Sequence, residues 1–176
     1  MKLNFKQYSA AGEPLLILHG LFGSLQNWTW HSRKLSEYFA VYALDMRNHG
    51  ASPHSNDMNY PLMAQDILEF LDEHHITRAH ILGHSMGGKV AMQVALLAPE
   101  RINRLVIADV APVAYGGQRG EHDEIFEGLC ALDLPTVKSR SDADARLAPY
   151  VEDEVVRQFL LSNLVRQETG SFSWRI

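Results

Sequence analysis

A serine between two glycines directly follows a short apolar run, which is a position suited to a nucleophile. Residues 83–87 read Gly-His-Ser-Met-Gly, and a helical pattern begins at Gly88. A strand, a G-x-S-x-G turn and a helix in this order lift the serine hydroxyl above a sheet. Side chains on the flanking residues of such a turn would collide with the strand and the helix, so both are glycine. Ser85 is therefore predicted to be a nucleophile for acyl transfer. The alternative is a serine that only caps the helix.

A nucleophilic serine also needs N–H donors aimed at the oxygen that becomes negative during acyl transfer. One donor is expected from the residue after the nucleophile, Met86. The other is expected from the loop after an early buried strand, where residues 14–23 read Pro-Leu-Leu-Ile-Leu-His-Gly-Leu-Phe-Gly. Leu21 is the first choice for this second donor and Phe22 is the second choice. We interpret His19 as a residue that shapes this loop, because it lies at the strand end beside its own glycine.

The sequence offers a candidate for the acid that would assist Ser85, but it offers no clear candidate for the base. Asp109 follows an apolar run, where the catalytic groups of open α/β sheets gather, and it is the predicted acid. Its alternative role is to cap the following turn. The base is usually a histidine that comes after the acid along the chain. The last histidine is His122, in a glycine-rich stretch, and His49 is an alternative base that could approach from the side.

Short apolar runs alternate with helical patterns along the first two-thirds of the chain. The predicted strands that are buried on both faces of a sheet are 15–18, 40–44, 79–82 and 104–108. Residues 2–8 alternate apolar and polar side chains and predict an edge strand. Helices are expected over 27–39 and 60–75. This alternation predicts an α/β fold with a doubly wound, mostly parallel sheet.

The pattern changes after residue 112. Residues 116–120 read Gly-Gly-Gln-Arg-Gly and are interpreted as a flexible connector. Beyond it we expect helices and no strand, and prolines at 135 and 149 separate the segments. The expected helices are 123–132, 136–147 and 152–167. The chain is therefore divided into a core, residues 1–112, and a small helical subdomain, residues 113–176.

Three motifs in the same chain resemble signatures of the α/β-hydrolase superfamily. The third of them, residues 45–53, reads Asp-Met-Arg-Asn-His-Gly-Ala-Ser-Pro and is similar to the D-x-R-x-x-G-x-S loop of that family. The fuller pattern includes residues 58–61 and 108–113, and it resembles small bacterial esterases of the YbfF type and their mitochondrial relatives. The resemblance implies that residues 113–176 form a cap over the serine. Apolar cap residues could face an acyl pocket or could hold the cap helices together; they are Ile125, Phe126, Leu129, Phe159, Leu160 and Leu164.

The resemblance implies a carboxylic-ester hydrolase that acts on acyl esters or thioesters through an acyl-Ser85 intermediate. The chain resembles the first two-thirds of such an esterase, so we expect an incomplete α/β-hydrolase fold without the last strands and the histidine loop. The alternative is a non-catalytic remnant or binding module that retains the pocket. A weaker alternative is another reaction on the same fold, such as that of a lyase or a cofactor-free oxygenase.

Composition favours a cytoplasmic enzyme that uses no cofactor. The 176 residues carry 16 Lys and Arg against 21 Asp and Glu, with the two signs interspersed, so neither nucleic acid nor a membrane is an expected partner. No leader sequence or membrane-spanning segment is predicted. No metal site is expected, because adjacent His74 and His75 point in different directions. Cys130 cannot form an internal disulfide and is expected to be a small core residue.

A final expectation concerns the partner of the last predicted strand. Residues 105–108 read Leu-Val-Ile-Ala, which is uncharged and strongly β-forming. An uncovered edge of this kind exposes unpaired N–H and C=O groups and favours pairing with another chain. We therefore expect either self-association into a homo-oligomer or a complementing chain at this edge.

Overall fold

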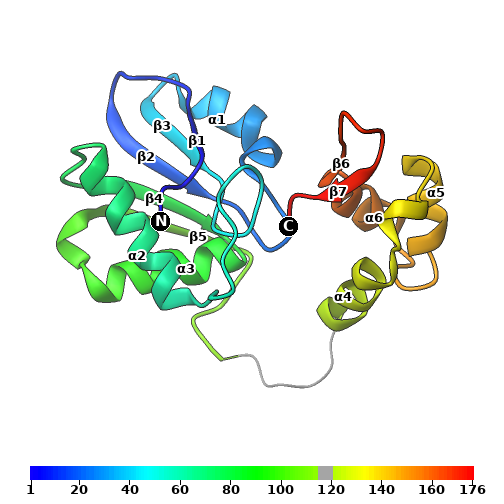
Figure 1. Cartoon of the computed structure of the whole chain (residues 1–176). Coiled ribbons are helices and arrows are strands. Elements are labelled where there is room, and N and C mark those ends of the chain that lie inside the picture. The colour runs from blue at the N-terminus through cyan, green and yellow to red at the C-terminus, as the bar shows by residue number, and fades with distance from the viewer. Residues whose placement is uncertain (115–120) are drawn as a thin grey trace. The chain divides into compact units, whose positions relative to one another are not determined.

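The computed structural model describes residues 1–114 and 121–176, and these form two compact units, Met1–Pro112 and Val113–Ile176 (Figure 1). The first unit contains a five-stranded sheet in the order β1-β3-β2-β4-β5. Its strands are β1 (Phe5–Gln7), β2 (Glu13–Leu18), β3 (Phe39–Leu44), β4 (Ala79–His84) and β5 (Ile102–Ala108). Only β1 is antiparallel to its neighbour, and it lies at one edge. The predicted α/β class with a mostly parallel sheet is confirmed.

Both faces of this sheet are covered, as the apolar strand sequences require. Successive side chains of a strand point to opposite faces. Leu16 and Leu18 of β2 therefore join the core under α2 (Tyr60–Glu73) and α3 (Met86–Leu97), which pack on each other. Leu15 and Ile17 join a smaller core on the other face. That core packs against residues from the 3₁₀ turn η1 (Leu25–Trp28) and from α1 (Thr29–Leu35).

Local sequence signals explain where these helices begin and end. Asn59 caps α2 by accepting the Leu62 N–H at 2.9 Å, and Pro61 occupies the first turn. The helix expected over 27–39 is shorter, because η1 replaces its start and α1 ends at Leu35. Phe39 already belongs to β3, where it pairs with Glu13 of β2. After α3, the 3₁₀ turn η2 (Pro99–Arg101) leads into β5.

The second unit contains three helices and a small hairpin among its described residues. Its elements are α4 (Glu121–Ala131), the 3₁₀ turn η3 (Leu134–Thr136), α5 (Arg140–Leu147), α6 (Glu154–Leu161), β6 (Leu164–Arg166) and β7 (Phe172–Trp174). The expectation of helices alone was wrong, because β6 and β7 pair antiparallel. A turn closes the hairpin through the Gln167 N–H bonded to the Ser171 carbonyl at 2.8 Å. Runs of three residues are too short for a periodicity argument to detect.

The structure also bears on the last expected helix, on Cys130 and on the expected connector. The helix expected over 152–167 ends at Leu161, where the Arg140 guanidinium donates to the Leu161 and Leu164 carbonyls. Cys130 is exposed, so its expected place in a core was wrong. The connector expected at 116–120 lies outside the described residues.

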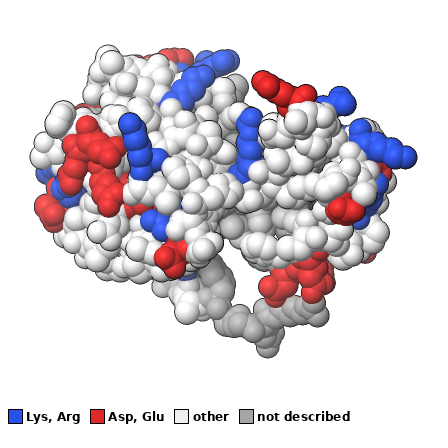
Figure 2. Space-filling model, in the orientation of Figure 1, with Lys and Arg blue, Asp and Glu red and all other residues white. Residues whose placement is uncertain are grey.

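Three observations concern a membrane, a metal ion and nucleic acid as possible partners. Within the described ranges, no helix is both long enough and apolar enough to cross a membrane. The same residues contain no group of three or more His, Cys, Asp or Glu placed to bind a metal ion. Basic side chains are interspersed with acidic ones on the face shown in Figure 2, with no extended basic patch on it.

Candidate active site

Ser85 lies in a strained turn between β4 and α3. Its φ of 49° and ψ of −114° place a non-glycine residue at positive φ, which is uncommon and costs backbone energy. The Ser85 N–H donates to the carbonyl of Ala108 at 3.0 Å, which ties the turn to the end of the neighbouring strand β5. Ser85 is therefore not an ordinary helix-capping serine, since its side chain makes no cap hydrogen bond to the helix.

The two glycines around Ser85 are required by close backbone contacts. A Cβ on Gly83 would lie 2.3 Å from the carbonyl oxygen of Gly87. A Cβ on Gly87 would lie 2.4 Å from the carbonyl oxygen of Leu18 in β2. Both distances are far inside van der Waals contact, so only glycine allows the strand and the helix to approach this closely. The spacing that predicted the turn thus has a direct steric cause.

The loop after β2 lies against Ser85. A Cβ on Gly20 would lie 3.3 Å from the Cβ of Ser85 and 2.9 Å from Nδ1 of His84. The Gly20 carbonyl accepts the Gly23 N–H at 3.0 Å and pairs with Nδ1 of His19 at 2.8 Å. The Gly20 carbonyl and the Leu21 N–H belong to the same trans peptide, so they point in opposite directions. The two hydrogen bonds to the carbonyl therefore also fix the direction of the Leu21 N–H.

Phe22, the second choice for the loop donor, has its amide engaged elsewhere. Its N–H donates to Nε2 of His49 at 3.2 Å, and its backbone has a φ of 60°. The structure therefore favours Leu21 over Phe22 as the donor of this loop.

Met86, the other expected donor, is the first residue of α3. The first N–H groups of a helix have no intrahelical acceptor, and the helix dipole favours negative charge at this end. The Met86 amide, directly after Ser85, thus lies at the positive end of the helix dipole.

Asp109 follows β5 directly, at the carboxyl end of the strand that pairs with β4. Its φ is 58°, its side chain is 85% exposed, and its Oδ2 lies 3.5 Å from Nε2 of His84. Ser85 and Asp109 thus stand at the ends of adjacent parallel strands, which is the edge where catalytic groups of such sheets gather.

His19 and His49 are buried and both are neutral. Nε2 of His19 accepts the Met46 N–H at 3.0 Å, and Nε2 of His49 accepts the Phe22 N–H. Each Nδ1 therefore carries the proton and donates to a carbonyl, that of Gly20 for His19 and that of Arg47 for His49. His19 shapes the loop as expected. The alternative of His49 as base was wrong, because neither of its ring nitrogens is available to Ser85.

Burial disfavours the charged form of both rings. Burial, with His49 nearby, lowers the pKa of His19 from 6.5 to about 4, and burial also lowers the pKa of His49. Between pH 6.5 and 4 the unfolded chain therefore binds more protons than the native one, and stability falls as the pH falls. We expect the free energy of unfolding to be lower at pH 5 than at pH 7.5 by roughly 2 kcal/mol from His19 alone.

Urea unfolding measured across this pH range tests the expectation. In His19→Gln the difference in unfolding free energy between pH 7.5 and pH 5 should be smaller than in the native protein by roughly 2 kcal/mol, because the titrating ring is gone. This holds whatever the stability of the variant at pH 7.5. An equal pH dependence in the two proteins would contradict the buried neutral state of His19.

The loop after β3 contributes contacts that the sequence did not indicate. The carboxylate of Asp45 accepts Asn4 Nδ2 at 2.7 Å, the Leu25 N–H at 2.8 Å and the Ala51 N–H at 2.9 Å. It thereby connects the start of η1 and the residue before β1 to the loop after β3. Arg47 forms a buried bidentate pair with Asp66 of α2, at 2.6 and 2.8 Å. The motif resemblance marked this loop, but only the fold brings these partners together.

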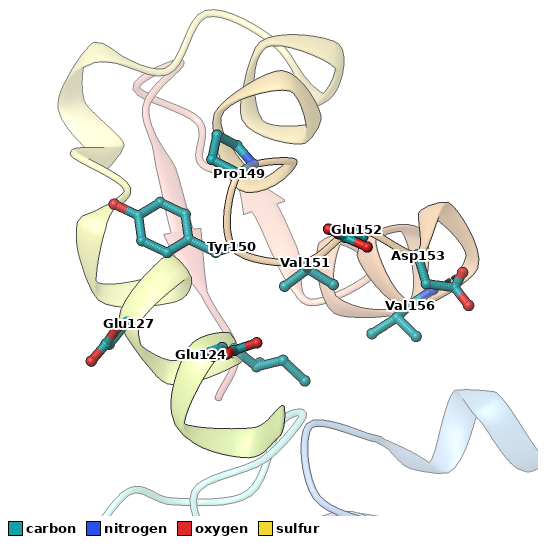
Figure 3. Close-up of a pocket in the computed structure, with 9 residues that line it drawn as sticks. Glu124, Glu127, Pro149, Tyr150, Val151, Glu152, Asp153 and Val156 are labelled. Atoms are coloured by element: carbon teal, nitrogen blue, oxygen red, sulfur yellow. Dashed lines mark hydrogen bonds between the residues drawn. The ribbon is translucent and has the colours of Figure 1, made fainter. Parts of the chain in front are cut away.

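The second unit holds a cavity of about 650 Å³ between α4 and the segment from Pro149 to Val156 (Figure 3). Ile125 lines it, together with Tyr150, two valines and four carboxylates. Leu129, Leu160 and Leu164 are buried and do not line the cavity. Phe126 is exposed and does not line the cavity.

Residues 13–168 match the family described as the alpha/beta hydrolase fold, and the chain therefore belongs to the α/β-hydrolase family. It is 42% identical to Esterase YbfF of Escherichia coli (strain K12), over 96% of this chain and 67% of that protein. It is also 42% identical to the sn-1-specific diacylglycerol lipase ABHD11 of Xenopus laevis, over 96% of this chain and 55% of that protein. The chain thus spans between about half and two-thirds of these relatives' length.

A solved structure described as a marine microorganism esterase superposes with a TM-score of 0.96 at 40% identity. The match covers 99% of this chain and 68% of that one. The fold described above and the predicted resemblance to YbfF-type esterases are both confirmed.

Proposed function

We propose that the protein is a carboxylic-ester hydrolase that acts through an acyl-Ser85 intermediate. The observation that carries this proposal is the strained turn at Ser85, with Gly20 of the loop after β2 packed against it. The names of the relatives support an esterase or lipase type of hydrolase. Comparing hydrolysis of nitrophenyl esters and acyl thioesters of increasing chain length by the protein and by Ser85→Ala tests the proposal and selects the substrate class.

In the proposed reaction Ser85 Oγ attacks the carbonyl carbon of the ester and gives its proton to a base. The carbonyl oxygen becomes negative and accepts hydrogen bonds from the N–H groups of Met86 and Leu21. The tetrahedral intermediate collapses, the alcohol or thiol leaves with the proton, and an acyl-serine remains. Water then releases the acid by the same steps. Asp109 would orient the base and stabilise its charged form.

One observation favours the non-catalytic alternative. The buried histidines His19 and His49 both have their ring nitrogens in backbone hydrogen bonds, so neither can serve Ser85. A base supplied by another residue would make the site catalytic, whereas a module that only binds an acyl compound would need no base.

We further propose that the second unit acts as the cap of this hydrolase and that its cavity contributes to substrate binding. Apolar Ile125, Val151 and Val156 would contact an acyl chain. The proposed substrate is a small-molecule acyl ester or thioester, and the proposed location is the cytoplasm. No cofactor takes part in the proposed reaction.

We propose that the sheet edge at β5 is where the chain pairs with a second copy or with a complementing chain. This strand ends the sheet, and Leu105 and Val106 on it are 37% and 52% exposed. Light scattering after size exclusion at micromolar concentration should show a mass above 19.8 kDa. Val106→Lys should reduce the association, since a charged side chain on an edge strand disfavours pairing with a strand of another chain. A monomer with a sharp melt would contradict the proposal.

A further inference from the structure

The loops after β2 and β3 are linked by two histidines in a reciprocal arrangement. His19, directly after β2, accepts the amide of Met46 from the loop after β3 at 3.0 Å. His49, in the loop after β3, accepts the amide of Phe22 from the loop after β2 at 3.2 Å. The ring centroids lie 5.1 Å apart, and both side chains are buried. Each loop therefore holds a backbone amide of the other, and we call this pair of bonds the histidine clasp.

Each ring of the clasp is also fixed at its second nitrogen. Nδ1 of His49 donates to the Arg47 carbonyl at 2.9 Å, and Nδ1 of His19 donates to the Gly20 carbonyl at 2.8 Å. A neutral imidazole has one donor and one acceptor, and both are used in each ring. The rings can therefore neither rotate nor flip without losing a buried hydrogen bond.

Phe22 is the residue that most needs this support. It adopts a left-handed φ of 60°, which is strained for a bulky side chain, and it is buried. A buried amide without an acceptor is strongly disfavoured. The Phe22 N–H follows the Leu21 N–H by one residue, so the direction of one peptide limits the direction of the other.

We propose that His49 is a positioning residue for the oxyanion loop, which by accepting the Phe22 N–H keeps the Leu21 N–H directed toward Ser85. The catalytic consequence rests on the proposed function, whereas the clasp does not. His49 does not touch the reacting atoms. It acts through the Phe22 peptide, in the way that His19 acts through the Gly20 carbonyl.

The proposal predicts a pH effect with a defined sign. Protonated His49 carries a hydrogen on Nε2 and cannot accept the Phe22 N–H, so acidification should loosen the loop. Burial lowers the pKa of His49, and the nearby charge on His54 lowers it further, while the Arg47 carbonyl and the carboxylate of Asp45 raise it. His19 is the other titratable group in contact with its ring.

Two variants separate the hydrogen bond from the shape of the ring. Gln at position 49 can place an amide oxygen near the position of Nε2 and accept the Phe22 N–H. Phe keeps a flat ring but has no acceptor. We expect His49→Phe to lower the Ser85-dependent rate by about 10²-fold with KM changed less than about twofold, because a small misplacement of a catalytic group has effects of this size. His49→Gln should recover most of the loss.

Hydrogen exchange measured by NMR tests the clasp without catalysis. The Phe22 amide should exchange at least about tenfold faster in His49→Phe than in the native protein, and near the native rate in His49→Gln. His54→Phe, the same change at an exposed position of the neighbouring segment, is the control for hydrogen exchange, and near pH 7.5 its Phe22 amide should exchange at the native rate. The acid limb of the rate should also be shallower in His49→Gln, which has no titrating ring at this position.

The outcomes distinguish the two proposals. If the Phe22 amide exchanges at the native rate in His49→Phe, the clasp is overturned. It is also overturned if His49→Gln hydrolyses esters as slowly as His49→Phe and its Phe22 amide loses as much protection from exchange. A rate that Ser85→Ala leaves unchanged overturns the proposed function instead, and the exchange data still decide whether His49 holds Phe22.

Discussion

Replacing Ser85 with alanine should abolish ester hydrolysis. In the proposed reaction every step passes through the Ser85 oxygen, and the strained turn presents no second hydroxyl at this place. In a form of the protein that carries a base, kcat should fall by about six orders of magnitude, as is usual when the nucleophile of such a unit is removed. Stopped-flow and long-time assays with nitrophenyl esters cover this range.

The control is Ser141→Ala, which removes a hydroxyl from the exposed surface of α5. It should retain native turnover. If Ser85→Ala also hydrolysed esters at the native rate, Ser85 would not be the nucleophile and the proposed chemistry would be wrong.

The second large effect concerns the 176-residue chain by itself. His19 and His49 have both ring nitrogens occupied, and the proposed acid Asp109 lies beside His84 instead. Neither of these two buried histidines can take the Ser85 proton, and a serine hydroxyl that has no base stays protonated near neutral pH. The backbone donors alone can supply about 10³- to 10⁴-fold over the reaction in water. We therefore expect slow hydrolysis of activated esters only, measured with nitrophenyl acetate.

Turnover at ordinary enzyme rates by this chain would contradict that expectation and would indicate a base within it. His84→Gln then identifies the base, because His84 and Asp109 form the His–Asp pair next to Ser85. A slow rate that His84→Gln leaves unchanged agrees with catalysis by the oxyanion donors alone.

The sequence predicted the fold and the turn because both depend on local patterns. Buried parallel strands are continuous apolar runs, so β2, β3 and β4 could be located from their residues. A Cβ on Gly83 or Gly87 would lie 2.3 or 2.4 Å from a backbone oxygen, so both positions require glycine and the G-x-S-x-G spacing can be recognised in the sequence. The resemblance to the α/β hydrolases added the order of the motifs.

The features that escaped prediction depend on contacts between distant residues. The His49–Phe22 bond joins positions 27 residues apart, and no spacing rule connects a ring nitrogen with a backbone amide of another loop. For the same reason His49 was open to interpretation as a base. The hairpin of β6 and β7 was missed because its strands have three residues each, which is too few for an alternating pattern.

If Ser85 forms a covalent bond to the acyl carbon, an irreversible reagent should leave an adduct on this residue that can be mapped. Incubation with a fluorophosphonate for hours accumulates even a slow product, so mass spectrometry of the intact protein and of its peptides detects it. We predict one adduct per chain, on the peptide that contains Ser85, and none in Ser85→Ala. An adduct at another residue, or no adduct on the native protein, would contradict the assignment of Ser85 as the nucleophile.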